Sequence, residues 1–445
     1  MLRQTLKRPA TSQATCSSIF TRFVRQQSTL PQLHTAFLAL GSNLGDRQRY
    51  IQQALDQLDA RGIQVINTSM LYESAPMYVT NQPAFLNGAA CVLTSLSPHQ
   101  LMKACQQIEK ELGRVKTIEK GARTIDLDVL LYDKDIVKTQ DLTIPHIGIA
   151  ERDFVKVPLS DITNLSAHGY EQPETSLPLY QPWLKPKTNL MLIYNATPDS
   201  FSDGGQQSLD RVADFCQDLD GIDMIDVGGQ STRPGAVPVS PQEEISRVVP
   251  VIGALRQAGV TMPISIDTFD ASVARAAYEA GATIINDVSA GVADPGMLPT
   301  AAQLGCPIIL MHMRGTPETM QQLCEYPDGV AETVMRELMQ RYQAAIAAGI
   351  RSWNLVLDPG LSFSKTLEQN IELMQTPLGG KIPWLVGASR KGFIGKITGV
   401  AEPDKRQIGT AVAVAQSIRQ GARIVRVHDK SMREAVRMAD MLYNR

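Results

Sequence analysis

Short apolar runs alternate with helical patterns from about residue 189 to the end of the chain. Eight runs rich in β-branched residues predict strands, at 190–195, 224–228, 263–267, 283–288, 307–313, 354–360, 384–389 and 423–429. Between several of them, apolar residues recur at helical spacing, as at 243–258 and 330–348. Eight strand–helix units predict an α/β TIM barrel, (β/α)8, over residues 189–445. A doubly wound open sheet is the alternative.

A different pattern precedes the barrel. An apolar run ends in Gly41-Ser-Asn43, and Asp46 begins an amphipathic helical segment. Further runs predict strands at 65–72, 85–93 and 124–132 and a helix at 99–112. This order predicts an α+β domain over residues 34–163. The proline-rich, aperiodic residues 164–188 predict a linker.

Residues 1–33 have the composition of an organelle presequence. No acidic residue precedes Asp46, whereas basic residues are interleaved with Ser, Thr and Gln. The basic residues include Arg3, Lys7, Arg8, Arg22 and Arg25. We therefore expect a mitochondrial (matrix) protein. A plastid presequence, or a disordered basic tail on a cytosolic protein, is the alternative.

Charge and hydropathy exclude two classes of partner. Lys and Arg number 43 against 45 Asp and Glu, for a formal net charge of −2. This balance offers no basic field for a nucleic acid. Charges, Gly or Pro interrupt every apolar run before the ~18 residues of a membrane-spanning helix, so we expect no membrane association.

Polar residues follow every predicted barrel strand. They are Asn195, Asp226, Asp267, Asn286 with Asp287, His312, Asp358, Ser389 with Arg390 and Lys391, and Arg426 with His428. One such residue alone is usually a helix cap or a turn. In a closed barrel, however, all eight strand ends meet at one rim, so together they predict a shared pocket. This mixture, without a Ser-His-Asp order, favours binding of a polar heterocycle and phosphate over acyl transfer.

Two loops and several strand ends carry a family resemblance. The loops are Asn195-Ala-Thr-Pro-Asp-Ser-Phe-Ser-Asp-Gly-Gly205 and Gly228-Gly-Gln-Ser-Thr-Arg-Pro-Gly235, and the strand ends include Asp358-Pro-Gly360, Ser389-Arg-Lys391 and Arg426-Val-His-Asp429. Over residues 189–443 the chain resembles dihydropteroate synthase. The resemblance implies that the pyrophosphate ester of 6-hydroxymethyl-7,8-dihydropterin is joined to para-aminobenzoate, which yields dihydropteroate and pyrophosphate.

The same resemblance implies roles for individual residues. The pterin ligands would be Asp267, Asn286, Met313, Asp358, Phe363 and Lys391. The pyrophosphate and aminobenzoate ligands would be Thr232, Arg233, Ser389, Arg426 and His428, with one Mg²⁺ on Asn195. Lys391 and Arg426 are the expected catalytic residues. Three positions depart from the family pattern, because Gln230 stands for a glutamate, Ser362 for a glycine and Ala196 for a valine, and we expect altered kinetics rather than loss of activity.

Two aspartates mark the N-terminal half, in Arg123-Thr-Ile-Asp-Leu-Asp128. On a strand, residues two apart share a face, so Asp126 and Asp128 are expected to project together. Such a pair binds a hard divalent cation, and basic residues on both sides of it suit phosphate oxygens. A solvent-exposed alternation is the alternative. The chain has no Gly-x-x-x-x-Gly-Lys loop, which argues against a P-loop fold.

Residues 37–162 resemble 6-hydroxymethyl-7,8-dihydropterin pyrophosphokinase. The matching pieces include Ala39-Leu-Gly-Ser-Asn43, Phe85-Leu-Asn87, Ile144-Pro-His146 and Arg152-Asp-Phe154. The resemblance implies a ferredoxin-like fold and pyrophosphate transfer from ATP to the pterin alcohol. Asp126 and Asp128 would hold two Mg²⁺, and Arg123 and Arg152 would join them as catalytic residues. The loop expected to close over ATP departs from the family, since 117–122 lacks a tryptophan and Ala122 replaces a proline.

This second resemblance also implies ligand sets. The ATP ligands would be Glu109, Arg114, Lys116, Arg123, His146 and Arg152. The pterin ligands would be Ser74, Phe85, Asn87 and Phe154. For the two phenylalanines, ordinary core packing is the alternative.

The product of the first reaction would be the substrate of the second. The sequence therefore predicts a bifunctional folate-biosynthesis enzyme that acts on small molecules and forms a homo-oligomer through its barrel. One rival is a pterin-dependent methyltransferase barrel, which would not need the Ser231-Thr-Arg-Pro-Gly235 loop. Another is a silent pterin-binding scaffold, which predicts losses among Asp126, Asp128, Lys391 and Arg426, yet all four are present.

Overall fold

The structure, a computed structural model, describes residues 32–114, 121–181, 183–196, 206–233, 235–237 and 239–443. The predicted presequence lies outside these residues, except for its last two positions. Within the described part, no helix combines the length and the apolar character that crossing a bilayer requires.

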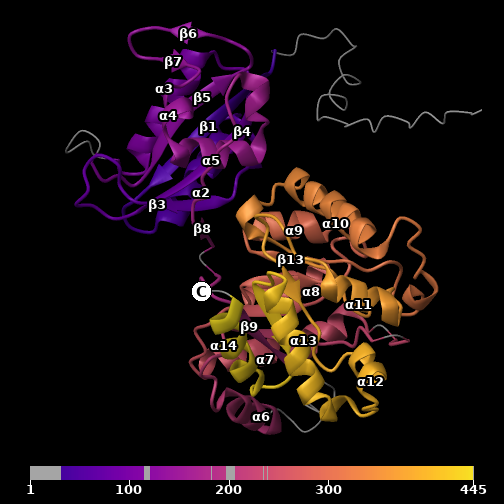
Figure 1. Cartoon of the computed structure of the whole chain (residues 1–445). Helices are drawn as coiled ribbons and strands as arrows, with labels where there is room; N and C mark the ends of the chain where they lie inside the picture. The colour runs from indigo at the N-terminus through magenta and orange to yellow at the C-terminus, as the bar shows by residue number, and fades with distance from the viewer. Residues whose placement is uncertain are drawn as a thin grey trace, which may run out of the picture.

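An antiparallel sheet forms the centre of the N-terminal half (Figure 1). Its strands run in the order β5-β1-β4-β3-β8, and β2 also pairs with β4. They are β1 (His34–Ser42), β2 (Gln64–Thr68), β3 (Leu71–Ser74), β4 (Phe85–Thr94), β5 (Asp126–Tyr132) and β8 (Leu179–Tyr180). A separate hairpin consists of β6 (Val137–Lys138) and β7 (Thr143–Ile144).

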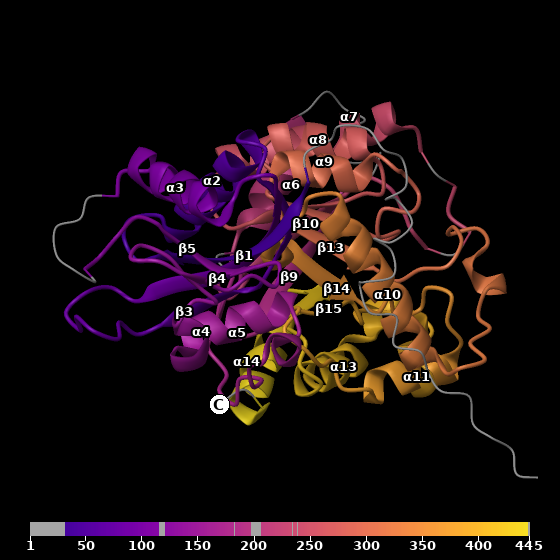
Figure 2. The same cartoon turned by 90° about the horizontal axis from the view of Figure 1, so that it is seen from above.

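Helices cover both faces of this sheet (Figure 2). The first face carries α2 (Arg47–Ala60) and α3 (Pro98–Glu111), and the second carries α4 (Gly148–Glu151) and α5 (Asp153–Ile162). Asp46 caps α2 by accepting a hydrogen bond from the Arg49 backbone. The buried residues of α2, Ile51, Leu55 and Leu58 among them, have helical spacing, so one stripe of the helix packs on the sheet.

The predicted strand at 65–72 is two strands. β2 and β3 both pair with β4, and the chain steps between them at Ser69 and Met70. The Ser69 hydroxyl accepts a hydrogen bond from the Ala89 backbone at 2.8 Å and donates to the Met70 carbonyl at 2.6 Å. The Ser69 side chain thus replaces part of the backbone hydrogen bonding between the strands. The hydrophobic pattern of the sequence does not reveal this break.

Part of the predicted linker also joins the sheet. Leu179 and Tyr180 form β8, which pairs antiparallel with Leu71 and Tyr72 of β3. A second short element, a 3-10 turn at Leu165–His168, follows α5. Both are too short for a periodic signal.

The C-terminal half is a barrel of eight parallel strands. They are β9 (Asn189–Asn195), β10 (Met224–Gly228), β11 (Ile264–Asp267), β12 (Ile284–Asp287), β13 (Ile308–Met311), β14 (Leu355–Asp358), β15 (Leu385–Val386) and β16 (Ile424–Val427). Their order is β14-β13-β12-β11-β10-β9-β16-β15, and a parallel bridge from Leu357 to Trp384 closes the ring. The predicted fold class is confirmed. Several strands stop before the predicted polar ends, which form the rim.

Helices surround the barrel (Figures 1 and 2). They are α6 (Gln206–Cys216), α7 (Pro241–Gln257), α8 (Ala271–Glu279), α9 (Met297–Leu304), α10 (Val330–Ala347), α11 (Leu367–Gln375), α12 (Gly392–Thr398), α13 (Gln407–Arg419) and α14 (Met432–Tyr443). A continuous apolar core fills the layer between strands and helices. A smaller cluster that includes Met191, Met224, Ile309 and Val356 consists of barrel-strand residues together with Leu184, which precedes β9, and it fills the barrel interior.

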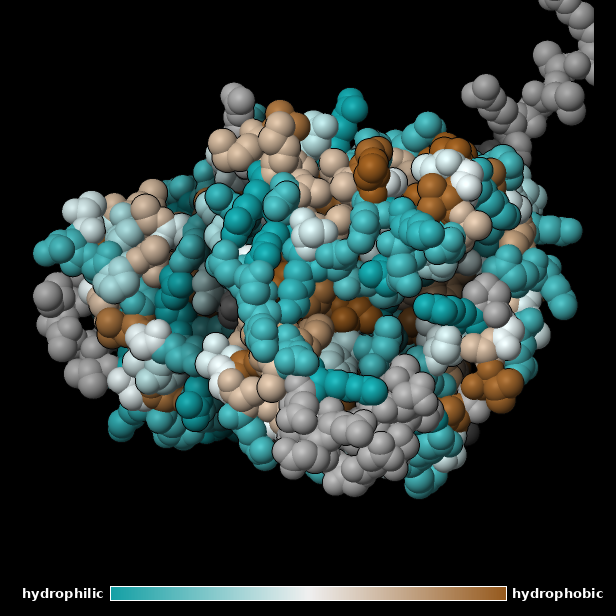
Figure 3. Space-filling view, turned by 90° about the horizontal axis from the view of Figure 1, so that it is seen from below, coloured by the Kyte–Doolittle hydropathy of each residue, from teal (hydrophilic) through white to brown (hydrophobic). Residues whose placement is uncertain are grey.

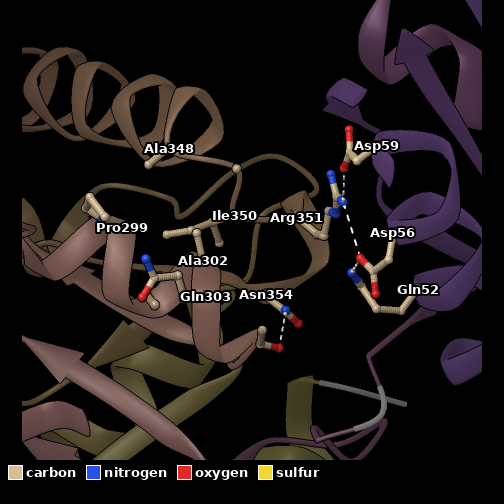
Figure 4. A pocket seen from close by; sticks show the side chains of 13 residues that line it. Gln52, Asp56, Asp59, Pro299, Ala302, Gln303, Ala348, Ile350, Arg351 and Asn354 are labelled. Atoms are coloured by element: carbon tan, nitrogen blue, oxygen red, sulfur yellow. Dashed lines mark hydrogen bonds and ion pairs between the residues drawn. The ribbon is translucent and has the colours of Figure 1, made fainter. Parts of the chain in front are cut away.

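The two halves share a buried contact. Trp353, in a 3-10 turn of the barrel (Ser352–Asn354), is fully buried in the apolar core of the N-terminal half. Beside it, Arg351 lies 3.2 Å from Asp59 and 3.7 Å from Asp56 of α2 (Figure 4). A cleft of about 370 Å³ opens next to Arg351 between the halves. The side chains that line it include none of the predicted site residues.

Two candidate active sites

Buried charges at the barrel rim converge on Arg426 of β16. Its Nε donates to Asp226 Oδ2 of β10, and its NH2 group donates to Asp267 Oδ2 of β11, both at 2.6 Å. Asn286 of β12 donates to the same Asp226 oxygen at 3.2 Å. The ends of four strands therefore meet in one network, as the barrel prediction required.

Two acceptor oxygens of this network face no donor. Oδ1 of Asp226 and Oδ1 of Asp267 are buried and have no hydrogen-bond partner among the described residues. A buried acceptor without a donor costs free energy. These oxygens are therefore suited to the N–H groups of a ligand.

The charges at the rim shift one another. Burial raises the pKa of Asp267 to about 7, and Arg426 opposes that shift. Burial lowers the pKa of Lys391 to about 8, as does Arg426, whereas Asp358 and Asp267 raise it. Burial likewise raises the pKa of Asp358 to about 6. Asp358 and Lys391 act on the charges of Asp267 and Arg426 because the four groups lie close together at the rim.

An apolar wall borders the charged network. Phe363 packs in a small cluster with Val288, Met311 and Met320, and Met313 packs against that cluster. The ammonium of Lys391 lies 4.3 Å from the centre of the Phe363 ring. Such a cation–aromatic contact holds the lysine above the ring. Figure 3 shows the molecule from below, with brown apolar side chains visible in a hollow among hydrophilic ones.

A second part of the rim is electropositive. His428 Nδ1 lies 3.1 Å from the Ser389 hydroxyl. Burial, and then the charges of Arg426, Arg390, Lys391 and Arg233, lower the pKa of His428 to about 4. Histidine is therefore neutral here at neutral pH, and the positive charge comes from its neighbours.

The remaining predicted rim residues lie at the entrance. Asn195 is exposed at the end of β9, Arg233 is exposed and Thr232 is half-buried. Most of the first predicted loop, 197–205, lies outside the described residues.

The structure accounts for Gln230, which departs from the family pattern. Its amide donates to the carboxylate of buried Glu244 at 2.7 Å. Burial raises the pKa of Glu244 to about 7. An amide avoids placing a second carboxylate against this one, since like charges in a buried site repel.

Sequence reasoning assigned no role to several buried or half-buried polar groups near the rim. His312 and Asp226 appeared only as strand ends, and Lys365, Glu337 and Glu244 did not appear. Lys365 lies in the loop after β14 and is almost completely buried. A lysine within a Ser-rich loop has no pattern that would mark it as buried.

The aspartate pair of the N-terminal half lies on β5 as predicted. Ile125, Leu127 and Val129 are buried, whereas Asp126 is half-buried and Asp128 is exposed. Arg114 lies 2.6 Å from Asp126, and Arg123 lies 3.3 Å from it. Positive charge therefore neutralises one member of the pair.

Glu109 supports the pair from α3. It is buried, accepts a hydrogen bond from the Leu127 backbone at 2.8 Å, and forms an ion pair with Arg114. Burial raises the pKa of Glu109 to about 7. Desolvation by surrounding protein, and then the Asp126 carboxylate, raise the pKa of Asp128, although its side chain still reaches solvent.

The predicted pterin and ATP ligands surround this pair in part. Asn87 is buried and donates to the Ser74 hydroxyl at 3.0 Å. The Arg123 guanidinium lies 5.2 Å from the centre of the Phe85 ring, and that of Arg152 lies 6.0 Å from the centre of Phe154. His146 is near enough to lower the pKa of Asp128, while Lys116 lies outside the described residues.

Among the described residues, Asp126 and Asp128 are the carboxylates that β5 offers to a metal ion. Across the residues that the structure covers, no group of three or more His, Cys, Asp or Glu side chains is arranged to hold a metal ion. Two carboxylates are nevertheless enough for Mg²⁺ when substrate phosphates supply further oxygens. The pair fits such an ion because its own repulsion favours a cation.

Two family models match the chain. Residues 37–164 match the 7,8-dihydro-6-hydroxymethylpterin-pyrophosphokinase family, and residues 191–428 match the pterin binding enzyme family. The chain is 46% identical over 432 residues to the folic acid synthesis protein fol1 of Schizosaccharomyces pombe, and this match covers 92% of the chain but 59% of that protein. It is 37% identical to a mitochondrial folate synthesis bifunctional protein of Arabidopsis thaliana, with 97% of this chain and 88% of that protein covered.

Solved structures match the barrel half alone or nearly the whole chain. Dihydropteroate synthase of Xanthomonas albilineans with 4-aminobenzoic acid is 39% identical, with a TM-score of 0.51, and the match covers 57% of this chain and 93% of that one. A Plasmodium falciparum HPPK-DHPS with pterin and p-hydroxybenzoate covers 94% of this chain and 98% of its own, with a TM-score of 0.74. At 20% identity, the latter likeness concerns the fold.

Proposed function

The chain belongs to the family of bifunctional folate-synthesis proteins, and from this premise we propose that it catalyses two consecutive reactions. The first transfers pyrophosphate from ATP to 6-hydroxymethyl-7,8-dihydropterin and releases AMP. The second condenses the pterin pyrophosphate with para-aminobenzoate and releases pyrophosphate. The observation that carries the proposal is the pair of unpartnered carboxylate oxygens on Asp226 and Asp267, beside the cations Arg426 and Lys391. Acceptors for N–H groups and cations for a phosphate therefore lie together at the barrel rim.

In the N-terminal half, Asp126 and Asp128 would hold Mg²⁺, which neutralises phosphate charge and orients the phosphates when bound. The arginines that now neutralise Asp126 are the proposed partners of the ATP phosphates. With them we assign Glu109, Lys116, His146 and Arg152 to ATP. Ser74 and Asn87 would bind the polar edge of the pterin, and Phe85 and Phe154 would contact its ring.

In the barrel, Asp267, Asn286 and Asp358 would accept or exchange hydrogen bonds with the amino-pyrimidine edge of the pterin. Lys391 would contact the pterin ring, and the Phe363 and Met313 side chains would form apolar walls beside it. Arg233, Arg426 and His428 would bind the pyrophosphate, with Mg²⁺ on Asn195. Thr232 and Ser389 would border the aminobenzoate.

The chemistry of the second step follows from these charges. Cleavage of the carbon–oxygen bond leaves positive charge on the pterin methylene and negative charge on the pyrophosphate. The Asp226 and Asp267 carboxylates, against the effect of burial, raise the pKa of Arg426, so its cation persists. It can stabilise the leaving group, while the buried carboxylates stabilise the cationic pterin. The amine of para-aminobenzoate then attacks the methylene and loses a proton.

One incubation tests the two activities together. Purified protein is mixed with hydroxymethyl-dihydropterin, ATP, Mg²⁺ and labelled para-aminobenzoate, and AMP and labelled dihydropteroate are measured. Both products are expected. AMP without dihydropteroate would restrict the activity to the N-terminal half, and neither product would support a silent pterin-binding scaffold.

A homo-oligomer through the barrel is supported by an exposed apolar surface. Ile408 and Val412 of α13 are 85% and 67% exposed, and Met438 and Met441 of α14 are 62% and 65% exposed. The two helices pack against each other. Surfaces of this kind commonly mark interfaces. Light scattering should give the mass of two chains, and Val412→Glu with Met441→Glu should give that of one.

The composition of residues 1–33 supports import into mitochondria. A fluorescent protein fused behind these residues should accumulate in the mitochondrial matrix. A fusion that stays in the cytosol, or enters plastids, would contradict this assignment.

A further inference from the structure

The loop after β14 brings Phe363 to the barrel rim in an unfavourable backbone conformation. Gly360, Ser362 and Ser364 all have positive φ, at 66°, 68° and 49°. Glycine adopts this region freely, whereas a serine there is strained because its Cβ crowds the backbone. Interactions elsewhere must therefore hold the loop in this shape.

Several side chains hold the loop from outside. Asn370 accepts a hydrogen bond from the Ser362 backbone at 2.6 Å, and Tyr326 donates to the Ser364 carbonyl at 2.9 Å. The Arg314 backbone donates to the Ser364 hydroxyl at 2.8 Å. None of these bonds involves Phe363 itself.

Lys365 is the residue whose side chain binds Phe363. Its ammonium donates to the carbonyl of Phe363 at 2.9 Å and lies 3.0 Å from Nδ1 of His312. The lysine is 4% exposed, as is His312. Burying a lysine is costly. The acceptors that hold it include the backbone of Phe363, one of the proposed pterin contacts.

A chain of polar groups orients the lysine. Burial, and then Lys365, lower the pKa of His312 to about 4, so its ring is neutral at neutral pH. Nε2 of His312 lies 2.8 Å from the Glu337 carboxylate and donates to it, which leaves Nδ1 as an acceptor for the ammonium. Arg314 donates to the same carboxylate at 3.1 Å. Hydrogen bonds therefore connect Arg314, through Glu337 and His312, to Lys365 and fix the position of its ammonium.

We propose that Lys365 is a positioning residue of the second reaction: by holding the Phe363 carbonyl, it fixes the ring against which Lys391 and the pterin lie. The 4.3 Å contact between Lys391 and the Phe363 ring links the two lysines. Lys365 need not touch the substrate. The inference rests on the proposed function of the barrel.

A double-mutant cycle tests the inference. Lys365→Met removes the ammonium but keeps most of the side-chain volume. We expect KM for the pterin pyrophosphate to rise about tenfold, because the ring is no longer held, with a smaller fall in kcat and little change in KM for para-aminobenzoate. Phe363→Ala alone should raise the same KM, and Lys365→Met should add little to it, since the lysine acts through that ring.

Controls separate this role from a general effect on folding. AMP formation by the N-terminal half should persist in Lys365→Met, and Lys187→Met, at an exposed lysine, should leave both reactions unchanged. If Lys365→Met does not yield folded protein, Lys365→Gln replaces it in the cycle with the same expected direction. An unchanged pterin KM, or effects of the two substitutions that simply add, would overturn the inference. A wild-type chain that forms no dihydropteroate would instead overturn the proposed function.

Discussion

Single residues at both sites carry charge that the surrounding protein does not fully satisfy. Asp126 is neutralised by Arg114 and Arg123, but Asp128 lies two residues on and has only weaker electrostatic support. At the barrel rim, one oxygen each of Asp226 and Asp267 is buried without a donor. Unsatisfied groups of this kind are costly in an empty protein and favourable once a ligand is present. They point to the residues whose replacement should affect one reaction only.

Asp128→Asn should abolish the first reaction and leave the second intact. The amide keeps the shape of the side chain but removes a charge that Mg²⁺ would need. We expect AMP formation to fall on the order of a thousandfold, equivalent to several kcal/mol of transition-state stabilisation. Dihydropteroate formation from preformed pterin pyrophosphate is the internal control, and Asp141→Asn, at an exposed aspartate, is the matched variant. Equal loss of both reactions would mean that the residues are assigned to the wrong half.

Lys391 should give the second reaction an alkaline limit. Burial lowers the pKa of this lysine to about 8, so the cation is lost as pH rises through that value and is fully present below it. We expect kcat/KM for the pterin pyrophosphate to fall above pH 8. Lys391→Arg keeps a cation over the whole range, so its profile should be flatter even if its rate is lower. Identical profiles for both proteins would assign the limit to another group.

At the scale of elements, the sequence predicted strands and helices well and loop geometry poorly. The run at 224–228 coincides with β10, and the helix expected at 330–348 coincides with α10 to within one residue. In a long segment the spacing of apolar residues shows which face is buried, so the pattern is sufficient to predict a helix or a strand. β8 has two residues and depends on β3 for its hydrogen bonds, and the 360–365 loop depends on Tyr326 and Arg314, which lie 38 and 50 residues from Ser364 along the chain. These contacts join residues that are far apart in the sequence, so no local sequence pattern predicts them.

The turn after β14 offers a test at this scale. Gly360 has φ of 66°, and a Cβ atom built on it would lie 2.0 Å from the backbone carbonyl oxygen of His312. Backbone cannot move aside as a flexible side chain can, so Gly360→Ala should destabilise the barrel by about 3 kcal/mol or more. Gly379→Ala is the control, because nothing lies within 4 Å of its Cβ position. Urea unfolding measures both, and equal midpoints would mean that the turn relaxes without cost.

At the scale of the whole molecule, the two halves are joined by more than the connecting chain. The Ser352 backbone donates to the Thr68 hydroxyl at 3.1 Å, and Lys381 lies 2.5 Å from Asp161 of α5. The Arg351 guanidinium reaches α2 (Figure 4). In each of these ion pairs one partner is still open to solvent, which limits the contribution of the pair to stability. The main contribution at this contact should therefore come from Trp353, which is fully buried in a core otherwise built from the N-terminal half and the β8 region.

Trp353→Ala should uncouple the stability of the two halves. Removing a large side chain from a packed core costs about 3–5 kcal/mol, and this core belongs to the half that carries Asp126 and Asp128. We expect wild-type chain to lose AMP formation and dihydropteroate formation over one temperature range. In the variant, AMP formation should be lost at a lower temperature than dihydropteroate formation. Arg351→Ala, which removes only the ion pairs beside Trp353, should shift either midpoint far less. If both activities of Trp353→Ala are lost together, the indole stabilises the barrel as much as its neighbour, and the halves unfold as one unit.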